Sequence, residues 1–240
     1  MKAFILAAGL GTRLRPITDS KPKALVEING ITFLEIVVQK LIRSGFKSVI
    51  INVHHFAEQI VEFVESKNFF GIEIKFSDER NLLLETGGGI KKAAWFFDDH
   101  KPFLVHNVDI LSGINLTALL NHHINNKSIA TLAVQKRKSS RYFLFDEDST
   151  LCGWTNEKEN ITKLTRKPVG ELSRLAFSGI QILEPAVFDC MIERDVFPLM
   201  ELYLSIASKH RITYFDHSNS MFIDLGKKEN LTEAEKLIGN

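Results

Sequence analysis

The residues best suited to chemistry gather near the amino terminus. Gly9 and Gly11 follow a short apolar run, Arg13 comes next, and Lys23 stands ten residues further along. Glycine lets backbone N–H groups approach an anion closely, and separated cations can neutralise a polyphosphate at more than one phosphorus. This spacing predicts a phosphate-binding loop.

Neither of the two commonest phosphate loops fits this stretch. A dinucleotide-binding fingerprint needs glycine at position 14, where the chain has Leu14. A Walker loop needs Gly-Lys-Ser/Thr, whereas the chain has Gly11-Thr12-Arg13. An NAD-binding oxidoreductase, which the opening strand and the Gly-x-Gly suggest, is disfavoured further because no acidic residue follows a second strand.

The elements that must position this loop alternate in type along the first half. The apolar patterns predict strands at 3–8, 48–53, 72–76 and 103–109, helices at 32–44 and 57–66, and a helix at 90–97 opened by the glycines 87–89. This βαβ rhythm is typical of an α/β protein with a mixed, mostly parallel central sheet flanked by helices. Ligands of such sheets bind at the carboxyl ends of the strands.

The second half predicts a different architecture. After a helix at 116–125, short apolar runs separated by polar turns indicate a small hairpin-rich lobe. Strands are expected at 130–135, 142–145, 151–155 and 180–183, an extended segment at 212–215, and helices at 184–192, 199–209 and 230–238. No linker separates the halves, so we expect a single domain over 1–240 with two parts, at about 1–125 and at about 126–240.

The composition limits the partners. Lys and Arg total 30 against 29 Asp and Glu, which leaves no basic excess for a nucleic acid. The apolar run 3–10 is too short to span a membrane, and two cysteines are too few for a disulfide framework. We therefore expect a cytoplasmic protein, either a monomer or a small homo-oligomer, without nucleic-acid or membrane partners.

A longer signature contains the glycine loop. The run 6–18, Leu-Ala-Ala-Gly-Leu-Gly-Thr-Arg-Leu-Arg-Pro-Ile-Thr, followed by Lys-Pro-Lys-Ala-Leu at 21–25 and by Gly30, resembles the sugar-1-phosphate nucleotidyltransferases. Further matches follow in order at 84–90, 107–109, 177–180 and 222–226. The resemblance implies a Rossmann-like nucleotidyltransferase fold that takes a nucleoside triphosphate and a sugar 1-phosphate, with Mg²⁺ as cofactor. It also implies that the part at about 1–125 binds the nucleotide and that the part at about 126–240 binds the sugar.

The same resemblance implies a role for each matching residue. Arg13 and Lys23 would be catalytic, and Asp109 and Asp224 would bind the metal. The nucleotide would contact Leu6, Ala8, Gly9, Gly11, Thr12, Arg13, Lys23, Thr86, Gly87 and Gly88. The sugar would contact Glu85, Asn107, Lys167, Ser178 and Gly179. Lys167 is the least secure match, because Arg166 precedes it where the family has glutamate.

Simpler interpretations exist for the charged residues. Asp109 alone could cap a helix, Asp224 could pair with Lys227 or Lys228 on the surface, and Lys23 could be a solvated loop charge. Adjacent histidines such as His122 and His123 do not have zinc-ligand spacing. The joint presence of both aspartates and both loop cations favours a catalytic site.

The substrate assignment rests on subfamily likeness. The runs 85–90 and 177–180 and the short length most resemble the N-acetylmuramate-1-phosphate uridylyltransferases, which favours UTP and N-acetylmuramate 1-phosphate. Mannose-1-phosphate guanylyltransferases are the nearest alternative, followed by other hexose- or heptose-1-phosphate nucleotidyltransferases. A non-catalytic nucleotide-sugar-binding regulatory protein is a distant alternative. Val108 and Lys227 stand where many members have glycine and threonine, so we expect the sugar end of the pocket to differ.

Overall fold

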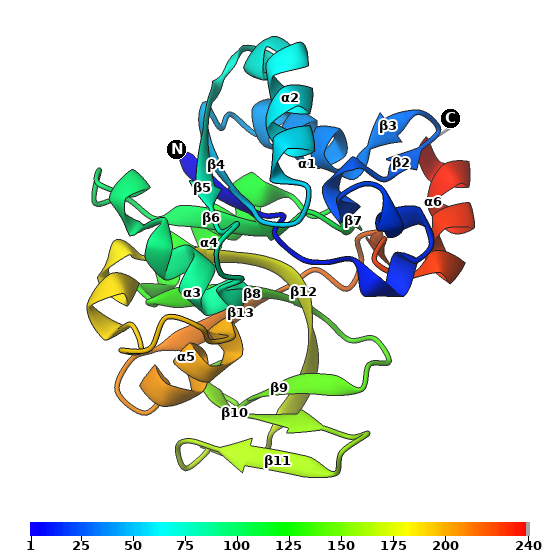
Figure 1. Cartoon of the computed structure of the whole chain (residues 1–240). Helices are drawn as coiled ribbons and strands as arrows, with labels where there is room; N and C mark the ends of the chain where they lie inside the picture. Colours follow the sequence, from blue (N-terminus) through cyan, green and yellow to red (C-terminus); the bar gives the residue numbers. More distant parts are fainter. Residues whose placement is uncertain (239–240) are drawn as a thin grey trace.

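The amino-terminal half of the chain contains a core of four parallel strands. The computed structural model describes residues 1–238. Strands β6 (Phe103–Asn107), β1 (Lys2–Leu6), β4 (Ser48–Val53) and β5 (Glu73–Asp78) lie in that order, and each pair is parallel. The crossovers between them contain helices α1 (Phe33–Arg43), α2 (Ala57–Ser66) and α3 (Glu85–Lys92). Figure 1 shows helices on both sides of this sheet.

Alternating side chains of the buried strands form two hydrophobic cores. Ala3 and Ile5 face the core that contains apolar residues of α1, α2 and α4 (Leu116–Asn126). Phe4, between them, faces the core shared with α3 and α5 (Leu199–Ile206). Successive side chains of a strand point to opposite faces, so a strand covered on both sides reads as a continuous apolar run.

The long strand β12 (Ser173–Leu183) joins the lobe to the parallel core. Its last residues, Ile180 to Leu183, pair antiparallel with β6, and its first three pair with β9 (Arg141–Phe145). From β9 the hairpins continue to β10 (Leu151–Asn156) and β11 (Ile161–Leu164), while β8 (Ala130–Gln135) and β13 (Ile212–Asp216) pair beside β12. This mixed sheet with an antiparallel lobe confirms the predicted fold class.

A small ribbon and the chain end complete the fold. Strand β7 (Ile110–Ser112) pairs antiparallel with β14 (Phe222–Asp224), and Asp224 stands opposite Ile110. This pairing brings residues more than a hundred positions apart to one edge of the sheet. Strands β2 (Glu27–Ile28) and β3 (Ile31–Thr32) form a short hairpin, and α6 (Leu231–Ile238) lies beside it (Figure 1).

Several predicted boundaries were wrong. The first strand ends at Leu6 rather than at residue 8, because the N–H groups of Ala7 and Ala8 turn to a side chain instead of a neighbouring strand. The glycines 87–89 lie inside α3, which begins at Glu85 and ends at Lys92, whereas a helix over 90–97 was expected. The predicted helix 184–192 is a 3₁₀ helix over Pro185–Cys190.

The lobe contains more strand than predicted. The expected strand 180–183 is the end of an eleven-residue strand, and β11 was not predicted at all. All four residues of β11 are exposed, so that strand carries no alternating apolar pattern. Within residues 1–238, no helix is both long enough and apolar enough to cross a bilayer.

Candidate active site

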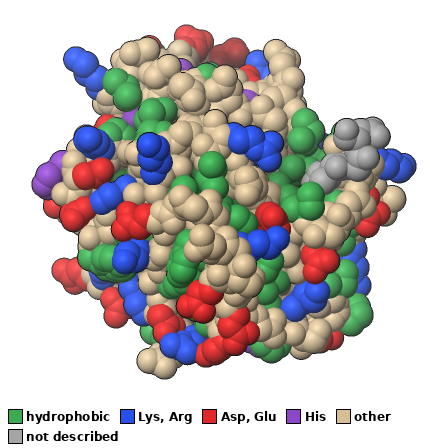
Figure 2. All heavy atoms as spheres, turned by 90° about the horizontal axis from the view of Figure 1, so that it is seen from above, with side chains coloured by type: hydrophobic (Ala, Val, Ile, Leu, Met, Phe, Trp, Pro, Cys, Tyr) green, Lys and Arg blue, Asp and Glu red, His purple; other side chains and the backbone are tan. Residues whose placement is uncertain are grey.

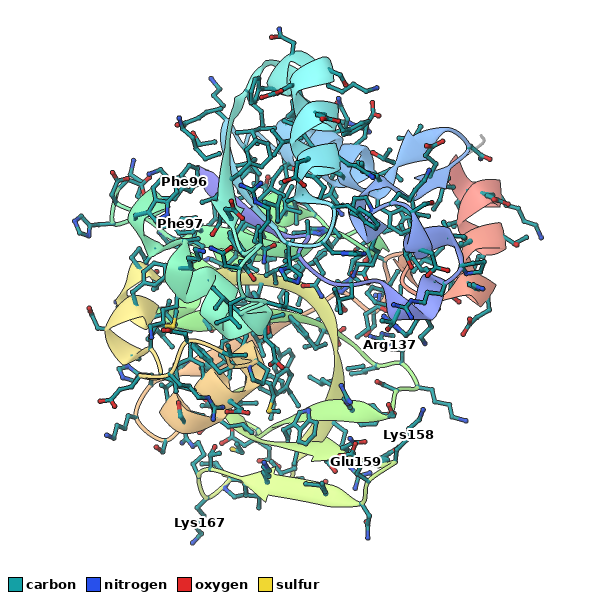
Figure 3. All side chains as sticks on the ribbon, viewed as in Figure 1. Phe96, Phe97, Arg137, Lys158, Glu159 and Lys167 are labelled. Carbon is teal, nitrogen blue, oxygen red and sulfur yellow. The ribbon has the colours of Figure 1, made fainter. Side chains whose placement is uncertain are left out.

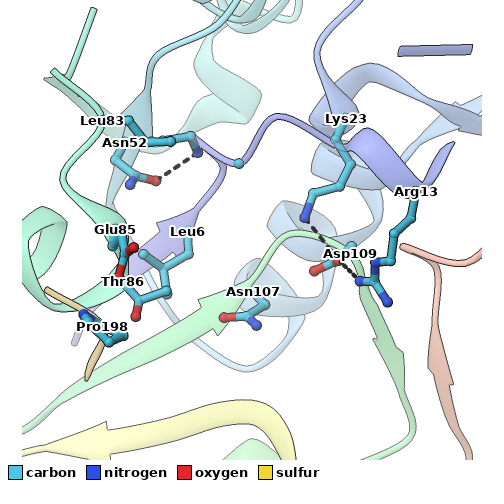
Figure 4. A pocket seen from close by; sticks show the side chains of 12 residues that line it. Leu6, Arg13, Lys23, Asn52, Leu83, Glu85, Thr86, Asn107, Asp109 and Pro198 are labelled. Carbon is cyan, nitrogen blue, oxygen red and sulfur yellow. Dashed lines mark hydrogen bonds and ion pairs between the residues drawn. The ribbon is translucent and has the colours of Figure 1, made fainter. Parts of the chain in front are cut away.

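A cavity of about 390 Å³ opens at the carboxyl ends of β1, β4 and β6. Leu6 stands in register with both Asn52 and Asn107, so the three strand ends meet at one level. Figure 4 shows the side chains that converge here. The lining residues are Leu6, Ala8, Gly9, Arg13, Lys23, Asn52, Leu83, Glu85, Thr86, Asn107, Asp109 and Pro198.

The glycine loop forms one wall of this cavity. Gly11 has φ +65°, and a Cβ there would lie 2.9 Å from Cγ2 of Thr18 and 3.0 Å from Cβ of Lys23. Its carbonyl accepts a hydrogen bond from Oγ1 of Thr18 at 2.9 Å. The position therefore requires glycine for both conformation and space. Gly11 and Thr12 support the loop from outside the lining, whereas Ala8 and Gly9 face the cavity.

A buried polar network anchors the start of the loop. Oδ1 of Asn52 accepts hydrogen bonds from the N–H groups of Ala7 at 2.6 Å and Ala8 at 3.2 Å. Its Nδ2 donates to Oε1 of Glu79 at 2.8 Å, and Oε2 of Glu79 accepts from the N–H of Leu84 at 3.1 Å. Burial of Glu79 raises the pKa of its carboxyl group. This network links the loop to the segment that enters α3.

Four charged side chains meet at and beside the other end of the cavity. Arg13, Lys23 and Asp109 line it, whereas Asp224 lies next to Arg13 outside the lining. Nζ of Lys23 lies 2.9 Å from Oδ2 of Asp109, and Nη1 of Arg13 lies 3.2 Å from Oδ2 of Asp224. Nη2 of Arg13 is also 3.9 Å from Oδ2 of Asp109 (Figure 4). The carbonyl of Asp109 accepts a hydrogen bond from the N–H of Leu225 at 2.8 Å, which holds the two strand ends together.

The carboxylates of the two aspartates both lie beside Gly226. A Cβ built at Gly226 would lie 2.5 Å from Oδ2 of Asp109 and 2.9 Å from Oδ1 of Asp224, so both carboxylates face one small space. Nη2 of Arg13 would lie 2.6 Å from that point and supplies positive charge there. Mg²⁺ commonly takes one or two carboxylates and completes its shell with water and substrate phosphates. Across residues 1–238, no larger group of His, Cys, Asp or Glu side chains is arranged to hold a metal.

Gly87 and Gly88 pack against the segment that precedes α5 instead of lining the cavity. The carbonyl of Phe197 accepts hydrogen bonds from both N–H groups, at 2.9 and 3.2 Å. A Cβ at Gly88 would lie 1.9 Å from the carbonyl oxygen of Asp195. Thr86, whose Oγ1 accepts from the N–H of Leu199 at 2.8 Å, does line the cavity.

The residues predicted to contact sugar are only partly brought together. Asn107 and Glu85 line the cavity, and Gly179, at φ +70°, packs against the amide of Asn107. Ser178 is fully buried, and its hydroxyl hydrogen bonds to Nε2 of His217 at 2.8 Å. Lys167 is exposed at the opposite end of the lobe from Lys158 (Figure 3), so the structure does not bring it to the cavity.

Sequence reasoning missed Asn52, Glu79, Leu83 and Pro198. Asn52 had a usable signal, because it is the one polar side chain within the apolar run 49–53, where a strand meets the ligand edge. Glu79, only 1% exposed, follows the next strand directly. Leu83 and Pro198 are ordinary loop residues whose importance depends on the docking of α3 against α5, for which the sequence has no local pattern.

Known proteins are similar to this chain in sequence and in fold. The chain is 31% identical to UTP–glucose-1-phosphate uridylyltransferase of Synechocystis sp., over 98% of its length and 62% of the relative's, so it spans less than two thirds of that protein. It is 29% identical to N-acetylmuramate alpha-1-phosphate uridylyltransferase of Neisseria meningitidis, over 100% of its length and 99% of the relative's. The crystal structure of HddC from Yersinia pseudotuberculosis complexed with GMP-PN superimposes with a TM-score of 0.80 at 23% identity, covering 99% of both chains.

The family assignment covers almost every residue. The family model described as nucleotidyl transferase matches residues 2–240, which include the glycine loop, both aspartates and the whole hairpin lobe. The chain therefore belongs to the nucleotidyl transferase family.

Proposed function

We propose that the chain transfers a nucleoside monophosphate from a nucleoside triphosphate to a sugar 1-phosphate and releases pyrophosphate. The observation that carries this proposal is the ion-paired cluster of Arg13, Lys23, Asp109 and Asp224 at and beside one end of the cavity. Two cations and two carboxylates at this spacing suit a reaction that must bring several phosphate groups together.

The chemistry needs positioning more than proton transfer. An oxygen of the sugar 1-phosphate attacks the α-phosphorus, and the bond from the α-phosphorus to the β-phosphate oxygen breaks. The nucleophile is already an anion, so no general base is required. Arg13 and the loop N–H groups would hold the leaving phosphates. Lys23, which is mostly buried, would neutralise the α-phosphate and the incoming phosphate.

Asp109 and Asp224, whose carboxylates both lie beside Gly226, would hold Mg²⁺. When bound, the ion would supply positive charge to phosphate oxygens in the transition state. Arg13 and Lys23 already neutralise the two carboxylates in the structure. These side chains therefore keep two like charges close together before any substrate arrives.

UTP and N-acetylmuramate 1-phosphate are the substrates that we favour. The support is the likeness to an N-acetylmuramate alpha-1-phosphate uridylyltransferase along the full length of both chains. The base would lie near Leu6, Ala8 and Thr86, and the sugar near Asn107 and Glu85. A guanylyltransferase that takes mannose 1-phosphate is the alternative. A reaction that consumes a nucleoside triphosphate is consistent with a cytoplasmic location.

Pyrophosphate release with a matrix of substrates tests the proposal. Each of UTP, GTP, CTP and dTTP is combined with N-acetylmuramate, glucose, mannose and N-acetylglucosamine 1-phosphates in the presence of Mg²⁺. We expect the highest kcat/KM with UTP and N-acetylmuramate 1-phosphate. A different best pair would replace the substrate assignment but keep the reaction, whereas no turnover with any pair would contradict the reaction itself.

A further inference from the structure

A second hollow, of about 880 Å³, adjoins the cavity and shares Arg13 with it. Five cations from the lobe and from the segment after β14 line it: Arg137, Lys138, Arg141, Lys158 and Lys227. We call this feature the basic hollow. Figure 3 shows Arg137 and Lys158 at the same end of the lobe.

The charges of the basic hollow are not balanced by the protein. Arg13 adds a sixth cation, whereas Asp224 and Glu229 are the carboxylates of its lining. Among the residues that the structure describes, none of the five cations forms an ion pair with a carboxylate. By contrast, the face of the molecule in Figure 2 shows Lys, Arg, Asp and Glu interspersed. The hollow is therefore a local concentration of unneutralised positive charge.

Among the residues of the basic hollow, Arg137 has the surroundings that most clearly favour an anionic ligand. It is half-buried, its guanidinium lies 4.4 Å from the ring centre of Phe222, and its Nη2 donates to the carbonyl of Phe177 at 2.8 Å. Its Nε is buried, with no hydrogen-bond partner among the described residues. Burial lowers the pKa of this guanidinium. Partial desolvation of a cation that has no ion-pair partner is costly, and an anionic ligand in the hollow would offset that cost.

The backbone of the hollow is held in place without a ligand. The N–H of Ser139 donates to the hydroxyl of Tyr142 at 2.8 Å, within the turn between β8 and β9. The N–H of Glu157 donates to the carbonyl of Ser140 at 2.8 Å, which fastens the β10–β11 turn to the β8–β9 turn. These contacts set the spacing of the two turns that carry Arg141 and Lys158.

We propose that the basic hollow binds a diphosphate group, namely the β,γ-phosphates of the bound triphosphate and then the pyrophosphate released from it. This inference rests on the proposed function. The excess of cations in the basic hollow matches a group with several negative charges better than it matches a single carboxylate on a sugar. Arg13, which we assign to the leaving phosphates, lines both spaces and connects them. The lobe therefore assists departure of the leaving group as well as facing the sugar.

Calorimetric titration with inorganic pyrophosphate and Mg²⁺ tests this inference. In the double variant R141Q/K158Q we expect the Kd for pyrophosphate to rise at least about tenfold, because two charge-assisted contacts are lost. The affinity for UMP, which lacks the diphosphate, should stay at its wild-type value. K163Q is the matched control, since Lys163 is an exposed lysine of the same lobe outside the hollow. Thermal unfolding verifies that each variant is folded.

Two kinds of result would overturn the inference. One is a wild-type Kd for pyrophosphate in R141Q/K158Q, or no pyrophosphate binding by the wild type. The other is a raised KM for the sugar 1-phosphate with unchanged pyrophosphate affinity, which would assign the hollow to the sugar. The titration needs no turnover, so a chain that fails to transfer nucleotide to any sugar would contradict the proposed function and still give a result here.

Discussion

Two surfaces border the cavity and the basic hollow: one formed by the parallel strands and the glycine loop, the other by the hairpin lobe. We call them the two walls, and they differ in how their charges and polar groups are satisfied. On the wall formed by the parallel strands, Lys23 pairs with Asp109 at 2.9 Å, and Asn52 accepts from two loop N–H groups. On the lobe wall, Arg137 and Lys158 have no carboxylate partner within residues 1–238. The polar groups of the first wall find their partners within the folded chain, whereas, in our proposal, the cations of the second wall find theirs in a ligand.

This difference has an energetic consequence. A buried group that loses its partner retains the full cost of its desolvation, so substitutions on the first wall should impair both stability and chemistry. An exposed cation without a partner contributes little to folding. Substitutions on the lobe wall should therefore impair ligand affinity alone. The following variants test that contrast.

Asp109→Asn should have the largest effect. Asparagine keeps the size but removes the charge that faces Lys23 and that would hold Mg²⁺. We expect kcat/KM for nucleotidyl transfer to fall at least about a hundredfold. The rate of pyrophosphate release at high Mg²⁺ measures this fall in kcat/KM. Asp98→Asn is the control, because Asp98 is an exposed carboxylate paired with Lys2 outside the cavity. A loss no greater than that of the control would remove Asp109 from the chemistry.

Gly226→Ala should block the space between the carboxylates. The added methyl would lie 2.5 Å from Oδ2 of Asp109 and 2.9 Å from Oδ1 of Asp224. We expect at least about a tenfold loss of kcat/KM, since small misplacements at a reacting centre are costly. A Mg²⁺ titration of activity should also shift to higher concentration. Gly113→Ala, whose methyl would meet its nearest atom at 3.4 Å, should behave as wild type. Equal activity of both variants would argue against a metal beside Gly226.

Gly88→Ala should act through stability. Its methyl would overlap the carbonyl oxygen of Asp195, which must move. Overpacking of this kind costs about 1–3 kcal/mol. Urea unfolding should show a lower midpoint than for Gly113→Ala. A wild-type midpoint combined with a weaker affinity for UMP would instead support the predicted contact between Gly88 and the nucleotide.

Glu79→Gln should change the pH dependence of stability. Burial raises the pKa of Glu79 above its ordinary value of 4.5, so folding favours the protonated carboxyl group. The wild type should therefore lose stability relative to Glu79→Gln as the pH rises from 4.5 through the raised pKa. The slope is at most about 1.4 kcal/mol per pH unit. Urea unfolding from pH 4 to 8 measures it, and a difference independent of pH would contradict the assignment.

Lys158→Gln should have the smallest effect on folding. Lys158 is exposed and unpaired among the described residues, so the free energy of unfolding should stay within about 0.5 kcal/mol of wild type. Urea unfolding of this variant and of the wild type at neutral pH measures the difference in the free energy of unfolding. A loss as large as that of Gly88→Ala would mean that this cation is part of the fold and that the two walls do not differ.

Local pattern predicted the parallel half well. The apolar runs at 3–8 and 48–53 are long enough to indicate buried strands, although the first strand ends at Leu6. The glycine loop has a motif of recognisable spacing. The pairing of Leu6 with both Asn52 and Asn107 could not be predicted, because strand register depends on contacts distant in sequence.

The lobe was less predictable for physical reasons. The exposed strand β11 leaves no hydrophobic alternation, and the shift of register around Gly179 depends on two different partner strands of β12. Glycines 87 and 88 were ambiguous, since close approach to a ligand and close approach to another backbone require the same residue. Apart from Arg13, the basic hollow combines residues from three separate segments, each of which resembles an ordinary polar stretch.

A double-variant cycle at Asp109 and Asp224 tests the central claim most directly. If the two carboxylates act as one unit in nucleotidyl transfer, each single Asn variant and the double variant should lose similar activity, because a unit is already disabled by loss of one member. The measurement is kcat/KM for pyrophosphate release by the wild type, both single variants and the double variant. Losses that multiply in the double variant would show that Asp109 and Asp224 act independently and would contradict a shared site.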